Sequence, residues 1–227
     1  MLDASTPNLA RAYDYLLGGG ANFAADRSLA GRFRELYPGA GELLSLSRTD
    51  RASSIESIAA AGVGQYVDVG SGLPTRPSVH GCARSQVPAA RVAYVDRDPA
   101  VVSHMTSLVP AGVRAFEGDL AEPEALLEEV SGFIDFRRPA CLLLTMVLQV
   151  LEPATARAVT GVLIRALAPG SYVVITAGAG PDGRLPDTVT GGGFEADDIA
   201  GFFAGLEVLP PGISRGRIIS GTGRKRG

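Results

Sequence analysis

The chain has 227 residues, of which 46% are hydrophobic and 20% charged, and its formal net charge is −3. This length and composition are typical of one globular domain with a full core, and they exclude a chain kept unfolded by an excess of polar residues. So small a negative charge provides no broad positive surface for a phosphate backbone, and nucleic acid is therefore not an expected partner.

The two cysteines, Cys82 and Cys141, lie far apart, and Cys141 falls in an apolar run where a buried, reduced thiol is expected. This indicates a reducing compartment. The chain opens without the basic and apolar segments of a signal peptide, and no apolar stretch has the length that crosses a bilayer. We therefore expect a cytoplasmic protein with no membrane partner. His80 and His104 are the only histidines, so no metal site is predicted.

The first part of the chain has a helical pattern. Apolar residues recur at three- and four-residue spacing over residues 8–61, with a break at the glycines of residues 18–20. We interpret residues 1–61 as a helical cap on the rest of a single domain.

From residue 65 onward, short apolar runs alternate with helical or turn segments. Predicted strands cover residues 65–69, 91–95, 113–117, 140–147 and 172–176, with two short strands near 207–209 and 217–220. Five strand–helix units predict an α/β fold with a doubly wound, Rossmann-like sheet over residues 62–227.

Helix starts are marked by capping residues. The first connecting helix is expected to begin near Ser78, and the second at Asp98, where an N-cap acid precedes a proline. Pro153 opens a helix predicted to reach residue 167, and residues 195–203 form a shorter one. Residues 177–193 are rich in Gly, Pro and Asp and predict a mobile loop.

The strongest local signal is the turn that follows the first predicted strand. Asp68 lies near the end of this strand, and Gly70 and Gly72 then free the turn of side chains, so that backbone can approach a ligand. A dinucleotide fingerprint would need a third glycine at Thr75, and the commoner methyltransferase form would need one at Pro74. The turn alone therefore completes neither pattern and does not identify the cofactor.

Acidic residues stand at the ends of three successive strands. They are Asp68, Asp96 and Asp119. A carboxylate after the second strand can accept both ribose hydroxyl hydrogens, and one after the third can accept from an adenine amino group. Asp68 would then lie near the ammonium of a methionine moiety. Each acid alone could simply cap a helix, but three at successive strand ends favour a nucleoside cofactor.

Several sequence motifs are spread nearly end to end along the chain. They are ARAYDYLLGG at 10–19, NFAADR at 22–27, DVGSGLPT at 68–75, YVDRDP at 94–99 and FFAGLE at 202–207, with Val79 and His80 between the third and fourth. Together these motifs resemble an actinobacterial family of S-adenosylmethionine-dependent methyltransferase-like proteins. In that family the glycine turn is likewise followed by Leu-Pro-Thr.

The resemblance implies a class I methyltransferase fold that binds S-adenosylmethionine. The cofactor-binding residues expected from it and from the strand ends are Asp68, Gly70, Gly72, Asp96, Asp119, Leu120 and Thr145. The resemblance does not supply a substrate. Our leading hypothesis is transfer of a methyl group to a small-molecule metabolite, and we expect a role in secondary metabolism and a possible homodimer.

The chain departs from the resemblance at two places that bear on catalysis. Gln149 and Ala177 stand where relatives tend to carry histidine, so two candidate bases are missing. Because methyl transfer needs mainly a well-positioned acceptor, a dedicated base is optional.

Three residues are candidates for a catalytic role. His80 is predicted in the first turn of the helix after the glycine turn, near the cofactor, and could act as a general base, although a polar packing role is the alternative. Tyr13 and Asp14 lie in a cap that can fold over the site and exclude water. Tyr13 could equally pack the cap onto the sheet.

Other functions remain open at the level of sequence. The fold could serve a non-methylating biosynthetic step such as a cyclisation or isomerisation, which the missing histidines favour modestly. It could also be a binding module that senses S-adenosylmethionine. A nicotinamide-dependent reductase is disfavoured because the third dinucleotide glycine and a Tyr-x-x-x-Lys pair after the fourth strand are absent.

Overall fold

The protein is built around one seven-stranded sheet. The computed structural model describes residues 4–178, 194, 196–214 and 218–227. The strand order is β3-β2-β1-β4-β5-β7-β6. Neighbours among β1 to β5 pair in parallel, and β7 pairs antiparallel with both β5 and β6. The strands are β1 Gln65–Val69, β2 Arg91–Asp96, β3 Val113–Glu117, β4 Cys141–Thr145, β5 Tyr172–Gly178, β6 Leu206–Val208 and β7 Ile218–Lys225.

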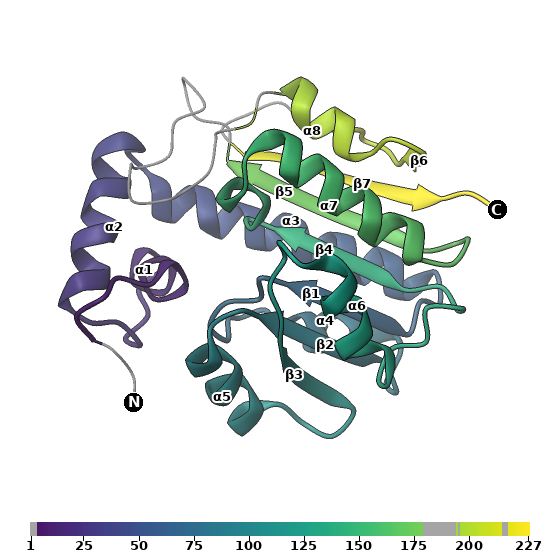
Figure 1. Ribbon diagram of the computed structural model, residues 1–227, viewed down its shortest axis with the longest axis horizontal. Coiled ribbons are helices and arrows are strands. Elements are labelled where there is room, and N and C mark those ends of the chain that lie inside the picture. The colour runs from purple at the N-terminus through teal and green to yellow at the C-terminus, as the bar shows by residue number, and fades with distance from the viewer. Residues whose placement is uncertain (1–3, 179–193, 195, 215–217) are drawn as a thin grey trace.

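Helices cover both faces of the sheet, which confirms the predicted doubly wound α/β fold (Figure 1). One face packs against α3 (Ala40–Ala60), α4 (Val79–Gln86) and α5 (Pro99–Leu108), and the other against α6 (Pro123–Ser131), α7 (Pro153–Ala166) and α8 (Ala196–Phe202). Alternate residues of each strand point to opposite faces. In β1, Tyr66 lies in the apolar cluster with α3 to α5, while Val67 and Val69 lie in the cluster with α6 to α8.

The predicted helix starts are confirmed where a capping residue is present. The side chain of Ser78 accepts a hydrogen bond from the Gly81 amide at the start of α4, and that of Asp98 accepts one from the Ala100 amide at the start of α5. Proline occupies the first turn of α5, α6 and α7, where its missing N–H costs nothing.

The N-terminal helical region differs from the prediction in having two breaks. It contains α1 (Leu9–Leu16) and α2 (Ala24–Leu36), and α3 then begins after Gly39, whose φ of 85° favours glycine. Only the first turns of α3 pack with α1 and α2; further along, Ile55 and Ile58 join the apolar cluster of the sheet. The second half of α3 is therefore a layer of the core and not part of the cap (Figure 1).

A buried ion pair holds the cap together. Arg11 Nε lies 2.8 Å from Asp26 Oδ2, and the two side chains are 9% and 0% exposed. Asp26 also accepts hydrogen bonds from the backbone amides of Asn8 and Phe23. Burial raises the pKa of Asp26, but the hydrogen bonds from Arg11, Asn8 and Phe23 outweigh it, so the pKa lies below its ordinary value.

The last strand is longer than predicted because its glycines admit a neighbouring ring. A Cβ at Gly221 or Gly223 would lie 2.9 or 2.8 Å from the ring of Phe203. These glycines therefore allow close packing and do not end β7, which continues to Lys225. Lys225 Nζ then donates to the carbonyls of Ile164, Arg165 and Leu167 at the C-terminal end of α7.

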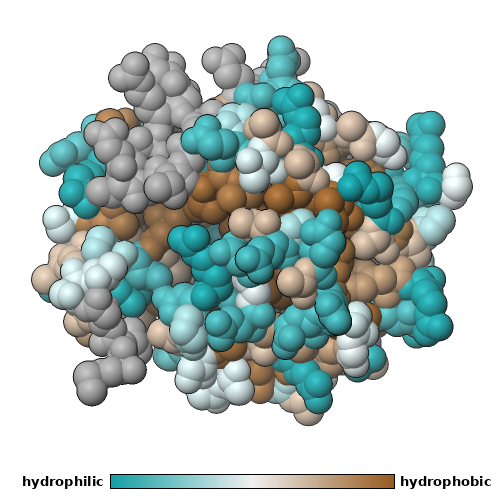
Figure 2. Space-filling model, in the orientation of Figure 1, coloured by the Kyte–Doolittle hydropathy of each residue, from teal (hydrophilic) through white to brown (hydrophobic). Residues whose placement is uncertain are grey.

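Figure 2 shows polar residues over much of one face of the molecule, with apolar residues exposed as a band between them. Within the described ranges, no helix combines the length and apolar character needed to span a membrane. Of the loop predicted for residues 177–193, the first two residues belong to the end of β5, and 179–193 lie outside the described residues.

Candidate active site

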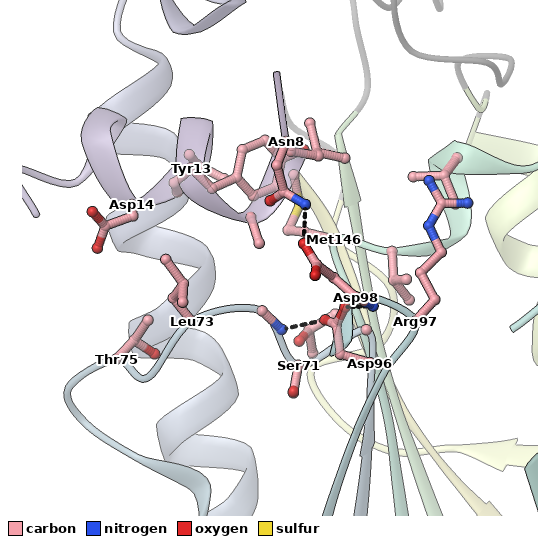
Figure 3. Close-up of a pocket in the computed structure, with 18 of the residues that line it drawn as sticks. Asn8, Tyr13, Asp14, Ser71, Leu73, Thr75, Asp96, Arg97, Asp98 and Met146 are labelled. Carbon is pink, nitrogen blue, oxygen red and sulfur yellow. Dashed lines mark hydrogen bonds between the residues drawn. The ribbon is translucent and has the colours of Figure 1, made fainter. Parts of the chain in front are cut away.

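The cavity that most of the predicted cofactor residues line is called the main cavity, although it is not the largest. It lies at the carboxyl ends of the strands, where the strand order reverses between β1 and β4. Its volume is about 240 Å³. One wall is the turn after β1, and the other is helix α1 with the residues just before it (Figure 3). Six of the seven predicted cofactor residues line it: Gly70, Gly72, Asp96, Asp119, Leu120 and Thr145.

The turn after β1 requires glycine at both predicted positions. Gly70 and Gly72 have φ values of 67° and 63°, in the left-handed region that disfavours side chains. A Cβ at Gly70 would also collide with the side chain of Val147. The amides of Gly70 and Ser71 both donate to the carbonyl of Val95, so the turn is fixed against the end of β2.

Asp96 anchors the same turn and faces the cavity. Its Oδ2 accepts from the Gly72 amide at 2.9 Å, and its Oδ1 accepts from the Asp98 amide at 3.0 Å (Figure 3). Because each carboxylate oxygen has two acceptor positions, both oxygens can still receive a hydroxyl hydrogen. Burial raises the pKa of Asp96, although the two amides oppose the shift. Asp119 uses only Oδ1, which accepts from the Ala121 amide at 2.9 Å.

The structure does not bring Asp68 into this cavity. Asp68 shares a face of β1 with Tyr66, so its side chain points toward the α3 and α4 side and lines a second cavity of about 910 Å³ beneath the turn. Its side chain is almost fully buried, its Oδ2 lies 3.8 Å from Arg51 Nη1, and no donor among the described residues reaches its Oδ1. Burial raises the pKa of Asp68 to about 6, against the opposing effect of Arg51.

This buried carboxyl predicts a pH-dependent stability. The folded-state pKa of Asp68 lies above its ordinary value of 3.8, so its contribution is fully present below about pH 4 and is lost as the pH rises to about 6. We expect the free energy of unfolding to fall by roughly 2 to 3 kcal/mol over this range because of this group. Asp68→Asn should remove that slope in urea unfolding curves measured from pH 4 to pH 7. An unchanged slope would show that Asp68 ionises normally.

His80 lies in the first turn of α4 as predicted, but its ring faces the second cavity and does not line the main one. Its Nδ1 lies 3.0 Å from the Tyr94 hydroxyl and its Nε2 lies 3.3 Å from Ser78 Oγ. Burial, with a smaller effect of Arg84, lowers the pKa of His80. Both ring nitrogens are thus engaged in fixing the start of α4, and this geometry does not support the predicted role of general base.

Tyr13 and Asp14 both line the main cavity, as the cap hypothesis requires. Burial raises the pKa of Tyr13 to about 12, so its phenol stays neutral near pH 7 and can donate a hydrogen bond but cannot serve as a base. Asp14 points away from the other labelled side chains (Figure 3) and accepts from the Ala21 amide and Asn22 Nδ2. Its hydrogen bonds therefore close the turn after α1.

Sequence reasoning missed two residues that shape the site. Asn8 caps α1 through its side-chain oxygen, and its Nδ2 donates to Asp98 Oδ2 at 2.6 Å across the cavity (Figure 3). Gln149 was noted only for the histidine it replaces, yet it is buried and donates to the Tyr13 hydroxyl and to the Met146 carbonyl. The N-cap pattern at Asn8 was a usable signal, but no local pattern marks Gln149.

Comparisons with known proteins agree with this geometry. The family model described as S-adenosyl methyltransferase matches residues 1–218. A candidate methyltransferase from Thermobifida fusca is 34% identical, with a TM-score of 0.91 and coverage of 99% of this chain and 97% of that one. A DUF574 family protein from Streptomyces avermitilis is 24% identical, with a TM-score of 0.91 and coverage of 98% and 99%.

More distant structures share the fold. The N-methyltransferase NodS of Bradyrhizobium japonicum, solved with S-adenosylhomocysteine, is 12% identical, with a TM-score of 0.52 over 95% of this chain and 98% of that one. None of the curated proteins matches the sequence. The comparisons favour methyl transfer over the non-methylating alternative. The chain belongs to the S-adenosyl methyltransferase family, with the predicted class I methyltransferase fold and S-adenosylmethionine as its cofactor.

Proposed function

We propose that the enzyme transfers a methyl group to a small molecule bound where the main cavity meets the cap. The observation that carries this proposal is the convergence of the glycine turn, Asp96 and Asp119 on one cavity that α1 covers. A cavity closed by the chain's own N-terminal helix suits a small acceptor better than a polymer.

The residues of the main cavity fit the cofactor. Asp96 has acceptor positions for ribose hydroxyls, and Asp119 has an unused carboxylate oxygen for an adenine amino group. Leu120, which is buried beside Asp119, offers an apolar contact to a base. The buried hydroxyl of Ser71 has no partner in the described part of the chain and lies on the wall shared by the two cavities, so it would hold the amino-acid end.

When bound, S-adenosylmethionine would supply an electrophilic methyl group, with the electron pair of the carbon–sulfur bond left on sulfur, and the proton of the methyl acceptor would be released to bulk solvent. The chain's own residues position the partners and exclude water. Helix α1 covers the site, and the neutral Tyr13 hydroxyl provides a hydrogen bond. Met146, which follows β4, holds a φ of 56°, a strained conformation of the kind found at functional sites.

The cellular setting is also part of the proposal. Both similar full-length structures come from actinobacteria, which supports an actinobacterial enzyme, and we place it in secondary metabolism. The two cysteines are free and buried, as expected of a protein of the reducing cytoplasm. A homodimer stays a prediction.

Two measurements test the function. Calorimetric titration should show binding of S-adenosylhomocysteine and none of NADH. Incubation with methyl-labelled S-adenosylmethionine and an actinobacterial extract should then place the label in the small-molecule fraction. Label found in the protein or nucleic-acid fraction would overturn the proposed substrate class, and binding of NADH alone would overturn the cofactor.

A further inference from the structure

A small third cavity adjoins the main one on the side of the cap. Its volume is about 50 Å³, and Tyr13, Leu44 and Met146 line both cavities. Its other walls come mainly from α1, α2 and α3, and include Phe33 and Tyr37. Among the described residues, none that lines it carries a charge. A group in this cavity therefore borders directly on the main cavity.

Gln149, which lines this cavity, has one side-chain acceptor that no described residue satisfies. Its Nε2 lies 3.0 Å from the Met146 carbonyl, which can only accept, so the orientation of the carboxamide is fixed. The same Nε2 donates to the Tyr13 hydroxyl at 3.3 Å. The side chain of Gln149 is 1% exposed, and its Oε1 is not reached by any donor within the described ranges. A buried acceptor of this kind costs free energy until a donor arrives.

Tyr13 supplies the complementary donor. Its hydroxyl oxygen accepts from Gln149, which leaves the hydroxyl hydrogen to point elsewhere. Because burial raises the pKa of Tyr13 to about 12, that hydrogen is retained at neutral pH. Two residues that line this uncharged, largely apolar cavity therefore hold one unsatisfied acceptor and one donor.

We propose that this cavity is the subsite for the substrate that receives the methyl group. It takes the uncharged end of that substrate, and this end carries a hydroxyl group. A hydroxyl can donate to Gln149 Oε1 and accept from Tyr13 at once, whereas an ammonium cannot accept and a carboxylate cannot donate. Either ion would also lose its hydration without a charged partner. A volume of about 50 Å³ holds only a few non-hydrogen atoms, so the rest of the substrate extends toward the main cavity.

This inference rests on the proposed function, and the test separates the two. With S-adenosylhomocysteine at saturation, we would measure binding of phenol, of its near-isostere toluene and of benzoate by ligand-observed NMR. The parent protein should bind phenol more tightly than toluene by roughly 3- to 10-fold, the effect of one or two neutral hydrogen bonds, and should not bind benzoate.

Two variants identify the source of this preference. Gln149→Met keeps the length of the side chain but removes the acceptor, so toluene should bind at least as tightly as phenol. Tyr13→Phe removes the donor, and with it the oxygen that accepts from Gln149 Nε2, but it leaves Gln149 Oε1 in place. It should therefore reduce the phenol preference only in part. The affinity for S-adenosylhomocysteine should stay within about twofold in Gln149→Met, because Gln149 does not line the main cavity.

Each outcome bears on one claim. Failure of the parent protein to bind S-adenosylhomocysteine would contradict the proposed function. Normal cofactor binding without saturable phenol binding, or with equal preference for toluene, would overturn the subsite alone. If Gln149→Met unfolds at lower urea but keeps the phenol preference, Gln149 merely supports Met146 and the subsite is overturned. Should that variant fail to fold, an unchanged phenol preference in Tyr13→Phe would overturn the proposed pairing of donor and acceptor.

Discussion

Replacement of Asp96 by alanine should weaken binding of S-adenosylhomocysteine on the order of 10- to 150-fold. A hydrogen bond to a charged acceptor contributes roughly 1.5 to 3 kcal/mol, and this carboxylate both faces the cavity and holds the Gly72 amide in the glycine turn. Its loss therefore removes the ribose contacts and loosens the turn together. Calorimetric titration measures the affinity, and a urea unfolding curve checks that the fold persists.

A suitable control for Asp96 must lie away from the cavity. Asp98 is unsuitable, because beyond capping α5 it lines the same cavity and accepts from Asn8. Asp135 is better matched, since its side chain also accepts a hydrogen bond from a backbone amide, that of Arg137. It precedes β4 and so lies at the amino ends of the strands, opposite the main cavity. Asp135→Ala should bind like the parent. Parent-like affinity in Asp96→Ala would show that the cofactor lies in a different register.

Breaking the ion pair inside the cap should cost about 3 to 5 kcal/mol of unfolding free energy, because either single change removes the opposite charge beside a buried ionised side chain. In Asp26→Ala the Arg11 guanidinium loses its ion pair with Asp26, and the amides of Asn8 and Phe23 lose their acceptor. Urea unfolding at pH 7 measures the loss.

The control and the pH dependence sharpen this second test. The Asp135–Arg137 pair is exposed, so Arg137→Ala should not change stability measurably. Because the folded-state pKa of Asp26 is lowered, its stabilisation is present above the ordinary pKa of 3.8 and disappears as the pH falls through the folded value. The penalty of Asp26→Ala should thus be constant near neutral pH and shrink in strong acid. A loss below 1 kcal/mol at pH 7 would contradict the buried pair.

The sheet was predictable from sequence because buried parallel strands are short apolar runs that end at turn residues. β1 and β3 have the predicted bounds, because a glycine directly follows each strand: Gly70 follows β1 and Gly118 follows β3. The second break in the helical region was missed because apolar spacing continues across Pro38 and Gly39, although this pair is itself a turn signal. The strand predicted near residues 217–220 was too short because local sequence cannot show that the glycines of β7 face an aromatic ring.

The site was predictable to the extent that it follows strand ends. Asp96 and Asp119 line the cavity at the strand ends because the carboxyl ends of neighbouring parallel strands meet at one edge. Asp68 and His80 line the second cavity instead, because strand alternation turns Asp68 to the face of the sheet on which α4 carries His80. The role of each residue in binding or catalysis stays a prediction. The role of Gln149 depends on Tyr13, 136 residues away, and this pairing is a tertiary contact with no local signature.

The contact between Asn8 and Asp98 has a consequence for the order in which the molecule assembles. The cap's own ion pair joins residues 15 apart, whereas this bridge joins residues 90 apart. Closing the longer loop costs more chain entropy, and during synthesis Asp98 emerges long after Asn8. The cap can therefore form early as a small local unit and dock only once β2 and the start of α5 are in place. The cavity between them is therefore incomplete until the cap has docked.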